Sequence, residues 1–460
     1  MKINQKFKRL IRLFFTFGIT SMLIILYSWT WIGYYNKIIE FPFFRRGNWM
    51  MIFLYGVILI LFMSIYGGYK VGYLKKGNLI YSQVLAVIFT NLFTYLQIAV
   101  LDKHFLNPLQ LIKMSIVDFS IIIVWTIVYQ WFYRKLFPPR KMLLISGGRS
   151  DYHLAEKINS REDKYEICQT INIQYGIDLI QREIMNYDGT IIGDISSHER
   201  NLILKYCYEN SIRTYSVPKI SDILLKSTVE LNLFDSPLLL SRNEGLSIEQ
   251  LFIKRLTDIA GAIVGLIITA PLFLLICLLI KFTDKGPAFF KQARLTKDNK
   301  IFYIYKFRTM IQEAEKDGVA RLAEDGDNRI IPIGHLLRRM RLDELPQLVN
   351  ILMGDMSFVG PRPERPELMR EIVNDIPEFS YRTKVKAGLT GYAQIYGKYN
   401  TTAYDKLKLD LTYIRNYSFL LDLKLILMTP KILFMKESTE GVKISKENMV
   451  KKNHEYDIND

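Results

Sequence analysis

Four long apolar runs at the start of the chain limit its possible folds more than any other feature. They cover residues 14–34, 49–66, 79–101 and 111–132, and each is close to the ~20 residues that a helix needs to cross a bilayer. Lysine and arginine precede the first run, fill the loop after the second and follow the fourth, whereas Arg45 and Arg46 depart from this pattern. Because basic loops stay on the cytoplasmic side, we predict four transmembrane helices within residues 1–138, with both ends of this block in the cytoplasm.

The composition agrees with a membrane protein that has basic cytoplasmic edges. Of the 460 residues, 50% are hydrophobic, and 61 lysines and arginines against 45 acidic residues give a formal net charge of +16. The apolar residues are grouped in long runs and the sequence has no zinc knuckle, so we expect no nucleic-acid partner. The cysteines, Cys168, Cys207 and Cys277, have no metal-binding spacing and are too few for a disulfide framework.

Residues 139–245 change to short β-type runs that alternate with amphipathic ones. This alternation predicts a parallel sheet with crossover helices, a Rossmann-like α/β domain. The first run ends in Gly147 and Gly148, but the glycine fingerprint is incomplete and no acidic residue is well placed for a ribose. We therefore predict a structural or regulatory module rather than a working NAD site, and its ligand stays open.

A fifth apolar stretch, residues 256–282, contains Pro271 near its middle. Lys254 and Arg255 precede it, and Lys281 and Lys285 lie at its far end, so both ends carry the basic flanks of the cytoplasmic side. Because proline bends a helix, we predict a re-entrant helix, broken at Pro271, that enters the inner leaflet and returns. A plain fifth transmembrane helix stays open as the alternative.

The stretch from residue 337 to 363 contains the strongest candidate for chemistry. Asp343 and Glu344 lie between two groups of arginines, Arg338, Arg339 and Arg341 before them and Arg362 after them. Arginine makes bidentate contacts to phosphate, and a carboxylate can be a covalent nucleophile or hold Mg²⁺. Pro346 suits the first turn of a helix, so the pair is predicted at a helix amino terminus. The structural alternative is an acidic helix start with surface ion pairs.

The remaining carboxy-terminal residues predict the surroundings of this pair. Lys306 and Arg308, one residue apart on a strand-like run, share a face and could both reach one phosphate. A helix is expected over residues 311–322. The mixed apolar and basic stretch 409–434 predicts interfacial helices on the inner leaflet, and an ordinary core helix stays open as the alternative for 420–428. The catalytic domain is thus placed at 246–434, and the charged tail 435–460 is predicted to be disordered.

Five segments in this order resemble the bacterial sugar transferase family, the polyprenyl-phosphate glycosyl-1-phosphate transferases. They are KQARLTKDNKIFYIYKFRTM (291–310), DNRIIPIGHLLRRMRLDELPQLVN (327–350), GDMSFVGPRPE (354–364), KAGLTGYAQIYGK (386–398) and LDLTYIRNYSFLLDLKLILMT (409–429). The resemblance implies the large form of the family, with four transmembrane helices, a Rossmann-like middle domain and a mainly α-helical monotopic catalytic domain carrying the re-entrant helix.

The resemblance also implies an activity and its residues. A hexose 1-phosphate would pass from a UDP-sugar to undecaprenyl phosphate in the membrane, giving UMP and the lipid diphosphate sugar that starts exopolysaccharide or capsule synthesis. Asp343 would be the nucleophile that forms an aspartyl-phosphosugar intermediate, and Glu344 would hold Mg²⁺. Substrate contacts are implied for six residues: Lys306, Arg308, Arg338, Arg362, Gln394 and Lys398. A homo-oligomer stays open.

The sequence departs from the family pattern at four places. They are Ala270 for serine before Pro271, Leu295-Thr296 for a frequent glycine, Ala387 for proline and Lys398 for arginine. None of these changes touches the acidic pair. A catalytically inactive scaffold or nucleotide sensor of a polysaccharide assembly complex is the alternative function. A transferase of a bare sugar would be expected to carry an Asp-x-Asp metal motif, and none is well placed.

Overall fold

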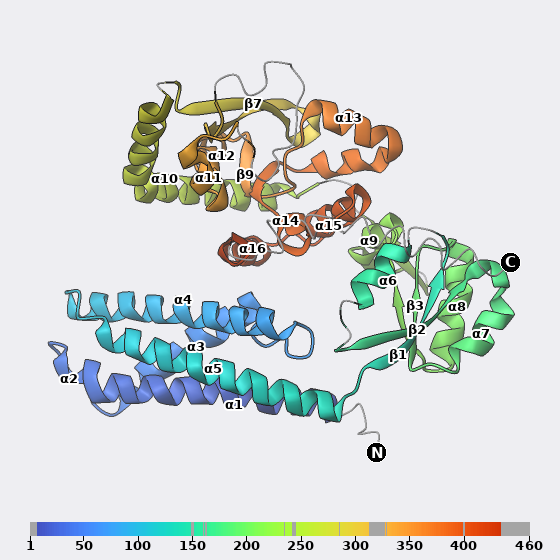
Figure 1. Ribbon diagram of the computed structural model, residues 1–460, viewed down its shortest axis with the longest axis horizontal. Helices are drawn as coiled ribbons and strands as arrows, with labels where there is room; N and C mark the ends of the chain where they lie inside the picture. The colour runs from blue at the N-terminus through green and yellow to red at the C-terminus, as the bar shows by residue number, and fades with distance from the viewer. Residues whose placement is uncertain are drawn as a thin grey trace. The chain divides into compact units, whose positions relative to one another are not determined.

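The computed structural model divides the chain into two compact units, Met1–Val217 and Pro218–Asp460 (Figure 1). It describes residues 7–148, 151–159, 161, 163–233, 235–241, 245–284, 286–311, 327, 329–398 and 401–433. The predicted disordered tail, 435–460, and most of the predicted helix at 311–322 lie outside the described residues. Each unit is described by itself below.

The four apolar runs of the first unit form long helices. These are α1 (Phe7–Thr30), α3 (Arg46–Tyr66), α4 (Lys76–Asp102) and α5 (Leu109–Leu136), with a π-helical turn (Trp31–Tyr35) and the short α2 (Asn36–Ile38) after α1. Each is long and apolar enough to cross a membrane, with α1 counted together with the turn and α2. Buried aromatic rings join them, as where Tyr27 of α1 stacks on Tyr55 of α3 with ring centroids 4.0 Å apart. In α5, the buried Asp118 accepts a hydrogen bond of 3.2 Å from Asn91 of α4.

The predicted parallel sheet follows these helices. Its strands are β1 (Arg140–Ser146), β2 (Tyr165–Asn172), β3 (Gly189–Ile192) and β4 (Arg213–Ser216), in the order β2-β1-β3-β4. The connecting helices are α6 (Asp151–Asn159), α7 (Ile177–Ile184) and α8 (Ser197–Glu209), with a 3-10 turn (Ile173–Tyr175) after β2. Figure 1 shows α7 and α8 on one face of the sheet and α6 on the other.

Successive side chains of β1 point to opposite faces of the sheet and are apolar on both, which explains why helices cover both faces. Leu143 and Ile145 pack among residues of α7 and α8, whereas Met142 and Leu144 pack on the face of α6. A continuous apolar strand is typical of a sheet that is buried on both sides. Gly147 has a packing role, since a Cβ there would lie 2.1 Å from the carbonyl oxygen of Asp194.

The second unit combines three two-stranded sheets with eight α-helices in its described part. Its strands are β5 (Val229–Leu233) with β6 (Ser236–Leu240), β7 (Phe289–Leu295) with β8 (Ile301–Phe307), and β9 (Met356–Val359) with β10 (Ala387–Thr390). Its α-helices are α9 (Ile220–Lys226), α10 (Ile248–Asp284), α11 (Pro332–Arg339), α12 (Gln347–Met353), α13 (Pro366–Asp375), α14 (Tyr392–Tyr396), α15 (Ala403–Arg415) and α16 (Phe419–Leu433). Three 3-10 turns, at Lys297–Asn299, Leu342–Glu344 and Pro377–Lys384, complete it.

The described residues between 218 and 241, which were predicted to belong to the middle domain, pack in this second unit. Arg415 of α15 donates hydrogen bonds to the hydroxyl of Ser227, at 2.6 Å, and to the carbonyl of Leu224, at 3.2 Å. Ile223 of α9 belongs to the same buried cluster as Leu411 and Ile414 of α15. The parallel sheet therefore ends before α9.

Helix α10 continues through Pro271, and Figure 1 shows it as two arms that meet at a bend. Ala262 and Leu266 pack against Leu348 of α12, and beyond the proline Ile276 packs against Phe307 of β8. A straight helix of its 37 residues would extend about 55 Å. The helix is thus bent where a break was predicted, and both arms contact the same compact unit.

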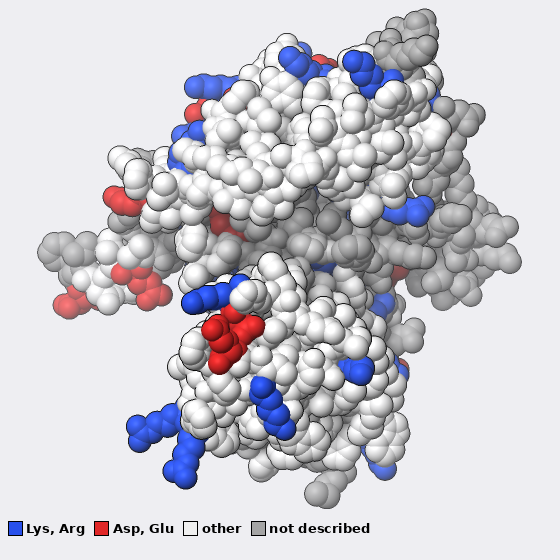
Figure 2. Space-filling view, turned by 90° about the vertical axis from the view of Figure 1, so that its left-hand side faces the viewer, with Lys and Arg blue, Asp and Glu red and all other residues white. Residues whose placement is uncertain are grey.

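The outward side of α10 is apolar and uncovered within the described residues. Its exposed side chains include Val264, Ile267, Ile268, Leu274, Leu275 and Phe282. Figure 2 shows broad areas of the viewed face that carry neither basic nor acidic side chains. Such a surface is typical of a protein that contacts a membrane.

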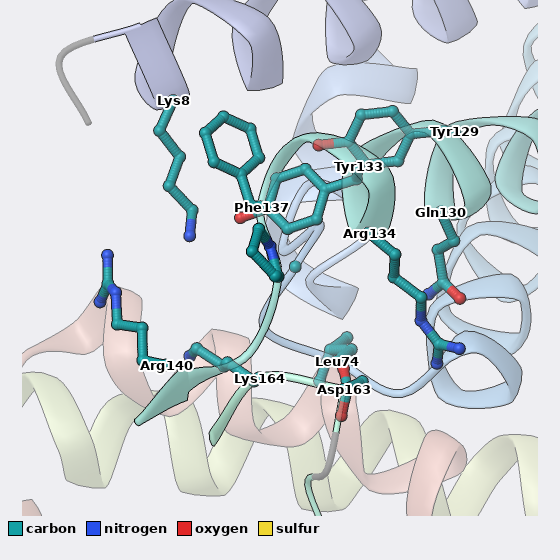
Figure 3. A pocket seen from close by; sticks show the side chains of 12 residues that line it. Lys8, Leu74, Tyr129, Gln130, Tyr133, Arg134, Phe137, Arg140, Asp163 and Lys164 are labelled. Atoms are coloured by element: carbon teal, nitrogen blue, oxygen red, sulfur yellow. The ribbon is translucent and has the colours of Figure 1, made fainter. Parts of the chain in front are cut away.

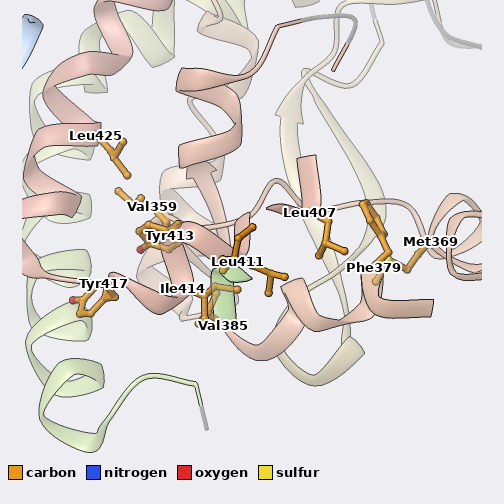
Figure 4. Packing of buried hydrophobic residues seen from close by; sticks show 11 residues of the cluster. Val359, Met369, Phe379, Val385, Leu407, Leu411, Tyr413, Ile414, Tyr417 and Leu425 are labelled. Atoms are coloured by element: carbon orange, nitrogen blue, oxygen red, sulfur yellow. Dashed lines mark hydrogen bonds between the residues drawn. The ribbon is translucent and has the colours of Figure 1, made fainter. Parts of the chain in front are cut away.

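The main core of the second unit lies between α13, α15 and the loops around β9 and β10 (Figure 4). Phe379, Leu407 and Leu411 are fully or almost fully buried there. Asp422 of α16 joins this core to α10, because it accepts hydrogen bonds from Lys254 at 2.6 Å and from the Tyr413 hydroxyl at 2.7 Å. Helix α15 therefore belongs to the core, although the sequence analysis assigned part of it to the interface.

Candidate active site

The acidic pair lies on a tight turn between two helices. Helix α11 ends at Arg339, and Arg341 takes the left-handed conformation with φ of 54°, which reverses the chain direction. Asp343 and Glu344 follow on the 3-10 turn Leu342–Glu344, and Pro346 is the N-cap of α12. The pair was predicted at the start of a helix, and the structure places it on the 3-10 turn just before α12.

Glu344 is the meeting point of three cations. Its Oε1 accepts hydrogen bonds from Lys306 Nζ and from Arg362 Nη2, each at 3.1 Å, and its Oε2 lies 3.8 Å from Arg341 Nη1. Lys306 comes from β8, Arg341 from the turn after α11, and Arg362 from the loop after β9. Glu344 is only 8% exposed, and Lys306 and Arg362 tie this turn to two separate segments.

The electrostatics of Glu344 follow from these contacts. Burial by itself would raise the pKa of the Glu344 carboxyl. The charges of Arg362, Lys306 and Arg341 outweigh burial and hold that pKa well below its ordinary value. Glu344 is therefore ionised at every pH at which the protein is expected to work, and it is a fixed negative charge.

Asp343 has a different environment although it is the next residue. Its carboxylate has no hydrogen bond or ion pair within the described part of the chain, and the residue is partly exposed. Burial raises the pKa of Asp343, and the charge of Glu344 raises it further. Lys306, Arg338 and Arg341 act in the opposite direction, since they favour the ionised form. Asp343 is thus a carboxylate beside cations that leave its oxygens available to a ligand.

The predicted phosphate-binding residues fall into two groups. Lys306 and Arg362 bind Glu344, and Arg338 lies near Asp343 with its Nε held by the Thr309 hydroxyl at 2.8 Å. Arg308 is buried one residue beyond β8, where its backbone N–H donates to the carbonyl of Ala288.

Gln394 and Lys398 form the second group, on α14 and just after it. The amide of Gln394 donates to the carbonyl of Leu389 at 3.5 Å, and Lys398 is exposed. Neither residue takes part in the ion pairs of Glu344. Their assigned contacts to substrate stay predictions.

The loop that carries Arg362 is held by residues that the sequence analysis missed. Arg382 donates from Nη2 to the carbonyl of Arg362 at 3.0 Å and from Nη1 to Glu364 at 3.1 Å, and its Nη2 lies 2.8 Å from the carboxylate of Asp410. Arg382 is 2% exposed and Asp410 is 1% exposed. Nothing in their spacing marks them, because they lie 20 to 48 residues from Arg362.

Two further arginines near the pair were not among the predicted site residues. Arg341 belongs to the arginine group that precedes the pair in the sequence, and it contributes a cation to Glu344. Arg294 donates to the carbonyl of Pro363 at 3.1 Å. Burial, followed by repulsion from Arg362 and Arg365, lowers the pKa of Arg294 to about 10. The site therefore carries more positive charge than the predicted residues alone.

Comparison with known proteins gives the family. The family model of the bacterial sugar transferases matches residues 249–436. The exopolysaccharide production protein PSS of Rhizobium leguminosarum bv. phaseoli is 39% identical over 191 residues, which are 39% of this chain and 94% of the relative. The chain belongs to the bacterial sugar transferase family. The matched residues include every residue described at the site.

Two larger relatives of the bacterial sugar transferase family match the same part of the chain. The UDP-N-acetylgalactosamine-undecaprenyl-phosphate N-acetylgalactosaminephosphotransferase of Aeromonas hydrophila is 42% identical over 39% of this chain and 43% of its own length. The UDP-glucose:undecaprenyl-phosphate glucose-1-phosphate transferase of Klebsiella pneumoniae is 39% identical over 45% of each chain. The chain thus matches less than half the length of either relative.

Proposed function

We propose that this sugar transferase moves a hexose 1-phosphate from a UDP-sugar to undecaprenyl phosphate, with release of UMP. The observation that carries the proposal is the pair itself: Asp343 has no hydrogen bond or ion pair in the described part of the chain, and three cations hold Glu344. Two relatives are named for this kind of transfer to undecaprenyl phosphate. The name of the Rhizobium relative supports a role in starting exopolysaccharide synthesis, or the related synthesis of a capsule.

In the proposed reaction, Asp343 is the nucleophile. Its carboxylate oxygen attacks the sugar-side phosphorus, an O–P bond forms, and the bond from this phosphorus to the bridging oxygen of UMP breaks. An oxygen of the lipid phosphate then attacks the same phosphorus and displaces Asp343. Lys306, Arg338 and Arg362 neutralise charge on the phosphates while these bonds change. No general base is required, because the attacking groups are already anions when ionised.

The residues present fit a Mg²⁺ ion that is shared with the substrate. Among the described residues no group of three or more acidic, histidine or cysteine side chains is placed to hold a metal. Mg²⁺ commonly uses one or two carboxylates and completes its shell with phosphate oxygens and water. Oε2 of Glu344 lies 3.8 Å from Arg341 Nη1, beyond hydrogen-bond distance, and would hold the ion. When bound, Mg²⁺ would neutralise charge on the diphosphate.

The same proposal places the reaction at the cytoplasmic surface of a bacterial membrane. The exposed apolar side of α10 and the bend between its arms support a re-entrant helix, because both arms pack on one compact unit and its outer side is free to meet lipid. A helix that enters and leaves the same leaflet keeps Asp343 on the side of the UDP-sugars. The first four helices and the Rossmann-like sheet are proposed to lie in and next to the same membrane.

The experiment that tests this function is a donor assay on the full-length protein in membranes with undecaprenyl phosphate. Radiolabelled UDP-glucose, UDP-galactose, UDP-N-acetylglucosamine and UDP-N-acetylgalactosamine are supplied separately, with Mg²⁺ or with a chelator. We expect one donor to label the lipid and to release UMP rather than UDP, and chelation to stop it. Release of UDP would contradict the transfer of a sugar phosphate, and failure of all donors would favour the inactive scaffold.

The transfer rate should also depend on pH through Asp343. Since the nucleophile must be ionised and burial raises its pKa, we expect the rate to fall on acidification at a pH above the ~3.9 of an ordinary aspartate. Glu344→Gln removes a negative charge that raises the Asp343 pKa. The acid limb of the residual activity of this variant should therefore lie at a lower pH than that of the wild type. The acid limb of kcat/KM reports the free enzyme and the free acceptor, and the free acceptor is the same molecule in both assays. If the acid limb lies at the same pH in the wild type and in Glu344→Gln, the group that titrates is the acceptor phosphate rather than Asp343.

A further inference from the structure

The first unit has a second basic site at one end of its long helices, far in sequence from Asp343. It is an open pocket of about 510 Å³, solvent at its mouth included, between the start of α1, the end of α5 and the edge of the sheet (Figure 3). Its lining comprises Lys8, Gly72, Leu74, Tyr129, Gln130, Tyr133, Arg134, Phe137, Pro138, Arg140, Asp163 and Lys164. We call it the helix-end pocket.

Cations from three segments meet in the helix-end pocket. Lys8 is the second residue of α1, Arg140 begins β1, and Lys164 precedes β2; each is partly buried. Figure 3 shows Lys8 directed toward Arg140 and Lys164, which reach toward it from the sheet. Of the described lining residues only Asp163 is acidic, and Arg161 already binds it through two hydrogen bonds of 2.8 and 3.0 Å. The pocket therefore has an excess of positive charge.

This excess has an energetic cost that a bound anion would remove. Burial lowers the pKa of Lys164, and the charges of Arg161 and Arg140 contribute to the same shift. Like charges that are held close together in a partly desolvated place repel one another, and a phosphate between them would be attracted by all of them.

The location of the helix-end pocket indicates a lipid phosphate rather than a soluble nucleotide. Parallel sheets bind nucleotides outside the carboxyl ends of their strands, whereas Arg140 is at the amino end of β1 and Lys164 precedes β2. The pocket instead lies where α1 begins and α5 ends. Lys8 lies over the rings of Tyr133, at 5.2 Å, and Phe137, at 4.9 Å, and such aromatic and basic residues mark the headgroup level of a bilayer.

We propose that the helix-end pocket binds the phosphate of an anionic phospholipid from the adjacent leaflet. The lipid phosphate is held jointly by α1 and by the amino-terminal edge of the sheet. It therefore links the membrane helices to the sheet and fixes the side of the sheet that faces the bilayer. The site is independent of Asp343 and needs no sugar donor.

The experiment is native mass spectrometry of the full-length protein released from nanodiscs of phosphatidylcholine with phosphatidylglycerol. The pocket variant carries Lys8→Gln, Arg140→Gln and Lys164→Gln. The matched control carries Arg9→Gln, Lys135→Gln and Lys141→Gln, which remove three exposed charges from α1, α5 and β1 outside the pocket. We expect the wild type and the control to retain a phosphatidylglycerol that the pocket variant loses, with an affinity reduced on the order of a hundredfold.

If the pocket variant and the control lose phosphatidylglycerol equally, the proposal is overturned, because the result would indicate general attraction of basic residues to the membrane. Retention of inorganic phosphate by the wild type in phosphatidylcholine discs, without preference for phosphatidylglycerol, would overturn the lipid source. If the triple variant does not fold, Arg140→Gln is compared with Lys141→Gln on the same strand. Lys8→Arg with Lys164→Arg should keep the lipid, since the charge is preserved.

Discussion

Asp343→Asn is expected to lower the transfer rate by at least about a thousandfold without a loss of thermal stability. The substitution replaces an attacking oxygen anion by a neutral amide of the same size. Folding should be unaffected because Asp343 has no hydrogen bond or ion pair within the described residues, and burial disfavours its charge. The measurement is initial transfer to undecaprenyl phosphate with the donor found in the assay above, together with a melting curve in detergent.

A single-turnover experiment distinguishes the nucleophile from a residue that only binds. With labelled donor and no acceptor, the wild type should retain label on the protein in a form that hydroxylamine releases, and Asp343→Asn should retain none. Asp298→Asn is the matched control, because Asp298 is exposed in the same unit and its left-handed conformation is one that asparagine tolerates. Asp343→Asn with near-normal transfer would place the nucleophile elsewhere.

Arg382→Gln should cost about 3–5 kcal/mol of unfolding free energy, the range for breaking a buried ion pair. The substitution removes the guanidinium that pairs with the buried carboxylate of Asp410. Glu364 also loses its ion pair with Arg382, but its ion pair with Lys406, at 3.2 Å, remains. For a unit of this size the melting temperature should fall on the order of 10 °C. The rate should fall as well, since the carbonyl of Arg362 loses the donor that positions its loop.

A double substitution separates charge from packing at this position. If the cost arises from the unpaired charge of Asp410, Arg382→Gln combined with Asp410→Asn should be more stable than Arg382→Gln alone. Arg370→Gln is the control, because Arg370 is exposed on α13, and its effect should stay within about 0.5 kcal/mol. A double variant less stable than the single one would mean that the two side chains act mainly by filling space.

The sequence predicted those features that arise from neighbouring residues. Apolar runs near twenty residues became helices, alternation became a parallel sheet, and Asp343, Glu344 and Arg338 were found as one charged stretch. Lys306 and Arg362 were predicted as phosphate contacts; the structure pairs both with Glu344, and their contacts to substrate stay predictions.

The sequence could not predict features that depend on distant segments. Arg382 and Asp410 are ordinary charged residues until folding buries them against the Arg362 loop. The need for glycine at position 388 also arises from a distant segment. A Cβ there would lie 2.0 Å from the backbone nitrogen of Gly360, at the start of that loop. The place of residues 218–245 was also decided by contacts with α15. Such pairings have no local period that could reveal them.

Both arms of α10 belong to the second unit, so the exposed apolar surface and the candidate active site lie in the same unit. The same residues that cover one side of the unit, such as Leu266 and Ile276, alternate with residues that remain open to lipid, such as Ile267 and Leu275. In the proposed function, the membrane contact and the reacting groups therefore lie in one continuous stretch of chain. The Rhizobium relative consists almost entirely of this stretch. Evolution could therefore add or exchange the preceding helices and sheet without altering the reacting groups.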